Sequence, residues 1–237
     1  MTEVLLTLAT ATRTASVALT AGEELLAEVT FNPPTTQSEV LLPAVEQALS
    51  GVNLDIDSVD AIAVVVGPGA FTGLRVGVAT AKGLALATGR PLIGISSLEA
   101  LAMQVPDVAL PVCALLDARK GEVYAGHFEW QSGMPQASKP EEVVDPEILL
   151  QAVSGNTLFV GDGSEVYRTL IIRKLGQRAL FAPASASVLR AGSVARIALR
   201  KFRNGDTVLP ENLNPVYIRP SDAEINEKRA IGNTIEG

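Results

Sequence analysis

A glycine-rich turn is the part of the sequence best suited to bind an anion. The Gly-Pro-Gly turn at residues 67–69 follows the apolar run at residues 61–66, and good helix formers then continue to Thr88. Thr72 is a suitable N-cap for that helix, and Gly89 is a suitable stop. Backbone N–H groups at such a helix start can bind an anion. The pattern therefore predicts a strand, a tight turn and a helix.

Small residues recur along this predicted helix at four-residue steps, at Gly73, Gly77, Ala81 and Ala85. An internal glycine costs a helix about 1 kcal/mol relative to alanine, so some close contact should offset Gly77. Three interpretations stay open. The small residues pack on the chain's own sheet, they pack against another protein, or the turn before them contacts a phosphate.

Further candidate residues lie in the second half of the chain. Asp117 and Arg119 follow an apolar run, where they either close a turn as an ion pair or contact a partner. Gly161-Asp162-Gly163 resembles a phosphate turn, but a lone glycine pair is weak evidence, and a plain strand-to-helix turn is favoured.

The remaining residues of chemical interest favour structural roles. Cys113 lies in an apolar run and is expected in the core. His127 is the only histidine and can supply only one metal ligand. Arg196, Arg200 and Arg203 line one side of a helix near its C-terminal end, where positive charge suits the helix dipole. A solvated face is favoured for them, with nucleic-acid contact as the alternative.

The bulk composition indicates a globular protein of one large domain or two ordinary ones. The chain has 237 residues, of which 47% are apolar and 19% charged, and its formal net charge is −7. An acidic chain is a poor free-standing nucleic-acid binder, because that affinity comes mainly from neutralising phosphates. The single cysteine excludes an internal disulfide framework. Neither a signal-peptide pattern nor a membrane-spanning apolar run is present, so we expect a cytoplasmic protein without membrane contact.

The order of predicted elements indicates that one plan is used twice. The first half has strands at 4–8, 15–19 and 25–31, a helix at 38–50, a strand at 61–66, a helix at 72–88, a strand at 92–95 and a helix at 98–104. The second half has strands at 112–116, 122–128 and 142–144, a helix from 146, a strand at 157–160, a helix at 164–174, a strand at 179–181 and a helix at 188–202. Hairpin-joined strands followed by alternating helices and strands predict a mixed α/β sheet with packed helices in each half. We place the first half at 1–105, the second at 106–220 and a polar tail at 221–237.

This duplicated plan resembles the actin-like, ribonuclease-H-like superfamily, and the glycine motif resembles that of the TsaB family of tRNA threonylcarbamoyladenosine biosynthesis proteins. The motif turn comprises Gly67, Pro68, Gly69, Phe71, Thr72 and Gly73. The second-half motif comprises Asp117, Arg119, Glu122 and Tyr124. Stretches 37–43, 81–85 and 214–219 also match, so the resemblance spans nearly the whole chain.

The resemblance implies a non-catalytic subunit that supports a related catalytic subunit, TsaD, in modifying the adenosine beside the tRNA anticodon. TsaD carries a metal-binding pair of histidines after its own glycine motif, whereas Ser97 and Leu101 occupy those positions here. Neither side chain replaces imidazole as a ligand, so no metal site is expected. Ala9 stands where kinases of the superfamily have a magnesium-binding aspartate, and its side chain offers no oxygen. An independent kinase-like ATPase and a metallopeptidase are the alternative functions.

The resemblance also implies partners. These are a TsaD-type subunit, a TsaE-type ATPase in a larger complex, a second copy of the chain when TsaD is absent, and tRNA only through the complex. No cofactor is expected on the isolated chain, but ATP or ADP is a candidate ligand at the interface with the partner. The implied interface residues are Leu41, Val45, Leu74, Arg75, Val76, Gly77, Thr80, Ala81, Leu84 and Thr88.

Overall fold

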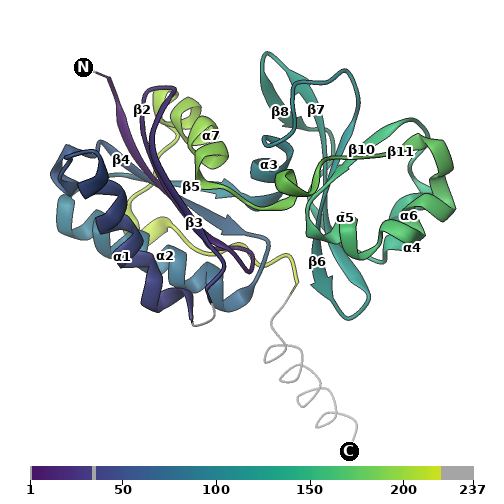
Figure 1. The fold of residues 1–237 in the computed structure, drawn as a ribbon, viewed down its shortest axis with the longest axis horizontal. Helices are drawn as coiled ribbons and strands as arrows, with labels where there is room; N and C mark the ends of the chain where they lie inside the picture. Colours follow the sequence, from purple (N-terminus) through teal and green to yellow (C-terminus); the bar gives the residue numbers. More distant parts are fainter. Residues whose placement is uncertain (1, 34–35, 220–237) are drawn as a thin grey trace, which may run out of the picture.

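The structure is a computed structural model that describes residues 2–33 and 36–219. The chain forms two α/β halves that lie side by side, each built on its own sheet (Figure 1). The predicted tail at 221–237 lies outside the described residues.

The first sheet has five strands in the order β3-β2-β1-β4-β5. They are β1 (Val4–Ala9), β2 (Ala15–Ala21), β3 (Glu24–Phe31), β4 (Ala61–Gly67) and β5 (Leu92–Ser96). The first three strands form an antiparallel meander, and β4 and β5 run parallel to β1. A mixed sheet of this kind needs helices as crossovers between its parallel strands, and the sequence supplies them.

Helices cover both faces of the first sheet (Figure 1). On one face lie α1 (Gln37–Gly51) and α2 (Phe71–Thr88), and on the other lies α7 (Ala191–Arg203). The short helix α3 (Ser97–Ala102) contacts strands of both sheets and so lies between the halves. A 3₁₀ turn, η1 (Ile56–Ser58), precedes β4.

The second sheet has six strands, in the order β11-β10-β6-β7-β8 with β9 also paired to β7. Its strands are β6 (Val112–Arg119), β7 (Glu122–Gln131), β8 (Met134–Ala137), β9 (Glu142–Val144), β10 (Thr157–Val160) and β11 (Ala179–Phe181). Its helices are α4 (Pro146–Gln151), α5 (Asp162–Val166) and α6 (Arg168–Leu175). Short 3₁₀ turns are η2 (Gly176–Arg178), η3 (Ala184–Ser187) and η4 (Pro210–Asn212).

The two sheets share one strand order, which confirms the predicted fold of two ribonuclease-H-like, mixed-sheet halves. In each, a central strand pairs with an antiparallel hairpin partner on one side and with parallel strands on the other. Strand β6 therefore corresponds to β1, and Asp117 lies near the end of β6 as Ala9 lies at the end of β1.

The cores follow from strand alternation, because successive side chains of a strand point to opposite faces. On β1, Leu6 and Leu8 pack with α1 and α2, whereas Leu5 and Ala9 pack in a second cluster shared by both halves. This shared cluster includes Leu98 of α3 and residues of α7 and the second sheet. Both faces of the first sheet are therefore buried.

Several predicted elements differ from the structure. Strand β8 was not predicted, and the helix expected at 164–174 is divided into α5 and α6. The helix expected from Val188 begins at Ala191. The division of the chain after residue 105 stays a prediction of domain limits, but helix α7, which it assigns to the second half, packs against the first sheet. Its apolar side fits there because Val194, Ile197 and Ala198 join the shared core.

Candidate functional site

The glycine turn at 67–69 packs against the chain's own first turn. Ala70 N donates a hydrogen bond of 2.7 Å to the carbonyl oxygen of Ala11. A Cβ placed on Gly69 would lie 2.2 Å from that same oxygen, and Gly69 has a φ of +159°. The glycine is therefore needed for close backbone approach. This part of the motif is used within the fold and supports the strand–turn–helix prediction.

The small residues of α2 also face the chain's own sheet. A Cβ on Gly73 would lie 2.1 Å from the Thr10 carbonyl oxygen, and one on Gly77 would lie 2.2 Å from Thr10 Oγ1. Thr10 Oγ1 in turn donates to the Gly73 carbonyl oxygen at 2.8 Å. Ala81 and Ala85 are buried in the core beneath α1 and α2. Of the three interpretations, packing on the own sheet accounts for all four positions.

Of the two predicted ends of α2, the C-terminal one is confirmed and the N-terminal one is wrong. Gly89 ends the helix with a left-handed φ of +70°, as expected. The N-cap is Ala70, which makes no side-chain capping bond, and Thr72 lies exposed within the first turn. The helix starts two residues earlier than the Thr72 cap required, because the chain is already held at Ala70 by Ala11.

Half of the predicted interface residues are buried within the chain itself. Leu41, Leu74, Gly77 and Ala81 pack in its own cores, which leaves them little surface for a partner. Val45 is also buried, but it lines a groove at the end of α1. The assignment of these five residues to an interface stays a prediction. Of the remaining positions, Arg75 is exposed, and the other four are half-buried on the outer side of the helices: Val76, Thr80, Leu84 and Thr88.

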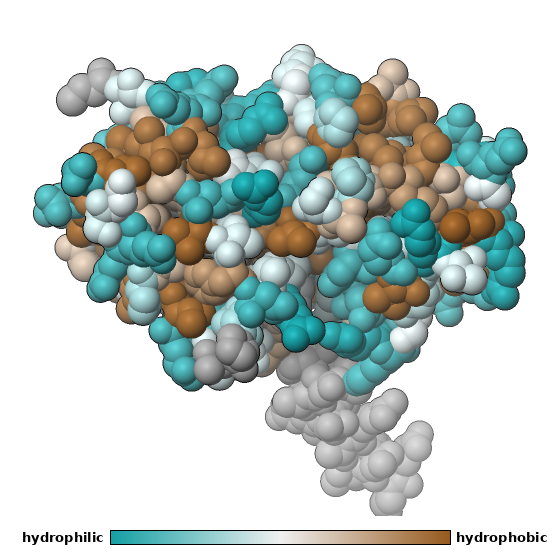
Figure 2. Space-filling model, in the orientation of Figure 1, coloured by the Kyte–Doolittle hydropathy of each residue, from teal (hydrophilic) through white to brown (hydrophobic). Residues whose placement is uncertain are grey.

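The exposed side of α1 and α2 carries apolar residues that are not among the predicted interface residues. Leu42 is 48% exposed, and Leu86 is 72% exposed. A groove of about 620 Å³ runs along the end of α1, lined by Leu42, Leu49, Leu54, Ile56 and Leu84 together with Glu46 and Asp55. In Figure 2, apolar residues reach the surface in several places on the half that contains α1 and α2. The sequence could have predicted that Leu42 is exposed. Buried positions in this helix repeat every three to four residues, and Leu42 comes directly after the buried Leu41.

The α2 start also carries a small cluster of side chains. The Arg75 guanidinium lies 3.7 Å from the centroid of the Phe71 ring, and the Phe71 and Tyr217 rings are 5.0 Å apart. Arg75 Nε donates to Tyr217 Oη at 3.1 Å. Phe71 and Tyr217 are each more than one-third exposed. Two of these residues come from the motif and one from the far end of the chain.

Comparisons with known proteins give the family. The protein of Escherichia coli (strain K12) named tRNA threonylcarbamoyladenosine biosynthesis protein TsaB is 33% identical over 226 residues, which cover 91% of this chain and 94% of that protein. The chain belongs to the TsaB family. A Bacillus subtilis (strain 168) protein of the same name is 27% identical over 93% of this chain and 96% of its own length. The family described as "TsaD: tRNA N6-adenosine threonylcarbamoyltransferase" matches residues 25–227.

A solved structure agrees with this assignment. A Pseudomonas aeruginosa protein described as having similarity to peptidase YEAZ superposes with a TM-score of 0.79 and 31% identity, covering 92% of this chain and 100% of that one. A likeness of this extent confirms the fold over both halves.

In this TsaB family member, the second-half motif forms a turn closed by its own side chains. Asp117 pairs with Arg119 at 3.2 Å, and Arg119 is 85% exposed. Asp162 Oδ1 accepts from Asp117 N at 3.0 Å. Burial raises the pKa of the Asp162 carboxyl, partly opposed by that backbone hydrogen bond. The ion-pair interpretation of Asp117 and Arg119 accounts for this geometry.

The other two motif residues lie on β7. Glu122 pairs with Arg219, and Tyr124 packs against the shared core, where burial raises the pKa of its hydroxyl. Gly161 has a φ of +101° and comes directly before α5. The turn at 161–163 is thus a strand-to-helix turn, as favoured from the sequence.

Ser97 and Leu101, at which the sequence predicts no metal ligand, have structural roles in this TsaB family member. Ser97 and Leu101 are fully buried, and the Ser97 hydroxyl donates to the carbonyl oxygen of Pro68, which ties α3 to the glycine turn. Across residues 2–33 and 36–219, no three His, Cys, Asp or Glu side chains are grouped as a metal site would need. Ala9 is buried and closes the end of β1 with a methyl group.

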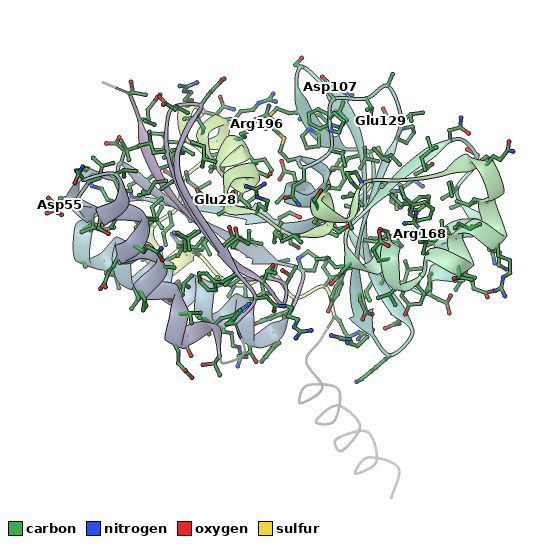
Figure 3. All side chains as sticks on the ribbon, in the orientation of Figure 1. Glu28, Asp55, Asp107, Glu129, Arg168 and Arg196 are labelled. Atoms are coloured by element: carbon green, nitrogen blue, oxygen red, sulfur yellow. The ribbon has the colours of Figure 1, made fainter. Side chains whose placement is uncertain are left out.

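The remaining candidates behave as predicted from the sequence. Cys113 is fully buried, and burial raises the pKa of its thiol to about 12. Burial lowers the pKa of His127, whose Nε2 lies 3.9 Å from Glu142. Arg203 pairs with Glu3 at 2.9 Å, and Arg196 lies on the exposed side of α7 (Figure 3). Within the part of the chain that the structure describes, no helix has the length and apolar character needed to cross a membrane.

Proposed function

We propose that this chain is a non-catalytic subunit in tRNA threonylcarbamoyladenosine biosynthesis and that it binds and supports a TsaD-type catalytic subunit. One observation carries the proposal: the glycines of the family motif pack against the chain's own first turn. Gly69, Gly73 and Gly77 each approach the first turn too closely to leave room even for a methyl group. The Cβ side of those three glycines is therefore filled by the chain's own first turn, which supports a structural role for the motif.

The side chains at the two first turns support the same conclusion. Autonomous phosphoryl transfer depends on oxygen ligands for magnesium and on positioned charge. Ala9 supplies no oxygen, and its second-half counterpart Asp117 is held by Arg119. Among residues 2–33 and 36–219, neither an independent kinase-like ATPase nor a metallopeptidase finds a group of His, Cys, Asp or Glu side chains that could hold its metal ion.

We place the partner surface on the exposed side of α1 and α2. Leu42 and Leu84 line the groove there, and Glu46 and Asp55 supply charge at its rim. An exposed apolar surface rimmed by polar residues is typical of protein–protein interfaces. The same surface would pair two copies of the chain when the TsaD-type subunit is absent. The proposal has four further parts. A TsaE-type ATPase joins the larger complex, and ATP or ADP binds at the subunit interface. The chain meets tRNA only through the complex, and it acts in the cytoplasm.

Reconstitution of tRNA modification with and without this chain tests the proposal. We expect modification by the TsaD-type subunit to require the chain, and the chain alone to show neither modification nor magnesium-dependent ATP turnover. Full modification by the catalytic subunit alone would refute the supporting role.

A matched pair of variants tests the surface. Leu42→Glu places a charge in the groove of α1, whereas Ile148→Glu does so at a 60% exposed position on α4 of the second half. Both should fold, because about half or more of each side chain is exposed to solvent. We expect Leu42→Glu to weaken association about 5–30-fold, as the loss of 1–2 kcal/mol would, and Ile148→Glu to leave it unchanged. Equal association of the two variants would exclude this surface.

A further inference from the structure

The last described residues run back along the first sheet after α7. Val208 and Leu92 exchange two backbone hydrogen bonds, of 2.8 and 3.0 Å. Leu213 is buried, and a Cβ on Gly94 would lie 3.1 Å from its Cδ1. Residues 208–213 therefore lie along β5, and the residues after them start beside the end of β4.

Residues 213–219, which we name the C-terminal strap, then cross the glycine turn. Val216 N donates to the Val66 carbonyl oxygen at 2.8 Å. The carbonyl oxygen of Val216 lies so near Gly67 that a Cβ there would approach it to 2.5 Å. The first glycine of the motif therefore makes room for the strap, as Gly69 makes room for the first turn.

Tyr217 joins the strap to the start of α2. Its ring packs against Phe71, and its hydroxyl accepts from Arg75. Arg75 thus has its guanidinium held on two sides, over the Phe71 ring and against the Tyr217 hydroxyl. A long side chain that is fixed in this way loses less conformational entropy when a partner binds it.

Arg219 joins the same strap to the second half. Its Nη1 donates to the Ala118 carbonyl oxygen at 2.7 Å, and its guanidinium pairs with Glu122. The Arg219 side chain is only 15% exposed. Ala118 and Glu122 flank the turn between β6 and β7, which carries the second-half motif. One short segment therefore links the glycine turn of the first half to the β6–β7 turn of the second half.

We propose that the C-terminal strap holds the start of α2 and the β6–β7 turn in one arrangement, and that Tyr217 and Arg219 are positioning residues for the partner-binding surface. Tyr217 orients Arg75 and Phe71, and Arg219 fixes the strap to the second half. The second part of this inference rests on the proposed binding of a TsaD-type subunit. The first part concerns the isolated chain alone.

Four variants separate the two residues' roles. Tyr217→Phe removes only the hydroxyl that accepts from Arg75, whereas Tyr217→Ala also removes the ring against Phe71. Arg219→Ala removes the link to the second half, and Arg219→Lys keeps the charge but loses the planar fork that contacts a carbonyl and a carboxylate together. Arg178→Ala is the control, because Arg178 also donates to two backbone carbonyls, those of Val153 and Ser154, but within the second half.

Hydrogen exchange of the isolated chain is the first measurement. We expect Arg219→Ala to raise amide exchange in the β6–β7 turn and at the start of α2 together by about tenfold, with a smaller rise in Arg219→Lys. Arg178→Ala should leave both segments unchanged. A rise in Arg219→Ala that is confined to the β6–β7 turn, or no rise, would overturn the coupling.

Association with a TsaD-type subunit is the second measurement. We expect Tyr217→Ala to weaken it about 5–30-fold and Tyr217→Phe by less, while the free energy of unfolding of Tyr217→Phe stays that of the parent. Unchanged association in Tyr217→Ala would overturn the positioning role. If the parent chain itself fails to bind the subunit, the proposed function fails, and the exchange experiment still decides the coupling.

Discussion

Gly77→Ala is the sharpest test of the packing of α2 on the sheet. The new Cβ would lie 2.2 Å from Thr10 Oγ1 and 3.5 Å from Val64 Cγ2. Thr10 is fully buried, and its hydroxyl donates to the Gly73 carbonyl oxygen, so it cannot move away without breaking that bond.

The magnitude follows from three contributions. Overpacking a core costs about 1–3 kcal/mol, and a disrupted buried hydrogen bond costs about 1–3 kcal/mol. Alanine gains about 1 kcal/mol over glycine in a helix. We expect a net loss of about 1–5 kcal/mol in the free energy of unfolding, measured by urea denaturation.

Gly83→Ala is the matched control on the same helix. A Cβ there meets nothing within 4 Å among the described residues, so only the helix propensity changes. We expect it to stabilise the chain by up to about 1 kcal/mol. If Gly77→Ala is as stable as Gly83→Ala, the small residues of α2 do not face the sheet, and that result would favour their assignment to a partner interface. Adding Thr10→Ala to Gly77→Ala should recover part of the loss, because it removes the overlapping oxygen.

Three further predictions concern single side chains. Ser96 accepts from the backbone N of Leu98 and Glu99, so Ser96→Ala should cost about 1 kcal/mol in urea denaturation. The Arg203 guanidinium lowers the pKa of Glu3 from 4.5 to about 2, so its stabilising effect is present above about pH 4.5 and is lost as the pH falls toward 2. Arg203→Ala should flatten the dependence of the unfolding free energy on pH in this interval. Cys113, buried and with its pKa raised to about 12, should resist thiol reagents in the native chain and react on unfolding, and fast native labelling would contradict the structure.

Much of the fold was predictable because hydrophobic patterning and local caps decide it. The strands at 157–160 and 179–181 were predicted to the residue, and Asp145 caps α4 as expected, with Pro146 at its first position. Strand β8 was missed because Met134, Pro135 and Gln136 lack the β-branched and aromatic residues that mark a strand. Its pairing with β7 comes from the hairpin itself.

The site was harder to predict than the fold. Glycines at four-residue steps indicate close approach, but they do not tell whether the neighbour is the chain's own turn or another protein. The decision depends on Thr10, which is far from Gly73 and Gly77 in the sequence and meets them only in the folded chain. The role of Tyr217 could not be predicted from the sequence either, because its partners Phe71 and Arg75 lie more than 140 residues earlier in the chain.

The return of α7 to the first sheet has a consequence for biosynthesis. Leu5, Ala9 and Ala18 face a cluster that α7 completes, so this side of the first sheet is uncovered until α7 has left the ribosome. Residues 106–190 must be made first, which takes roughly 4–17 s at ~5–20 residues per second. The N-terminal half therefore cannot finish folding as it emerges, and during that interval one apolar face of its sheet lacks the helix that covers it in the finished chain.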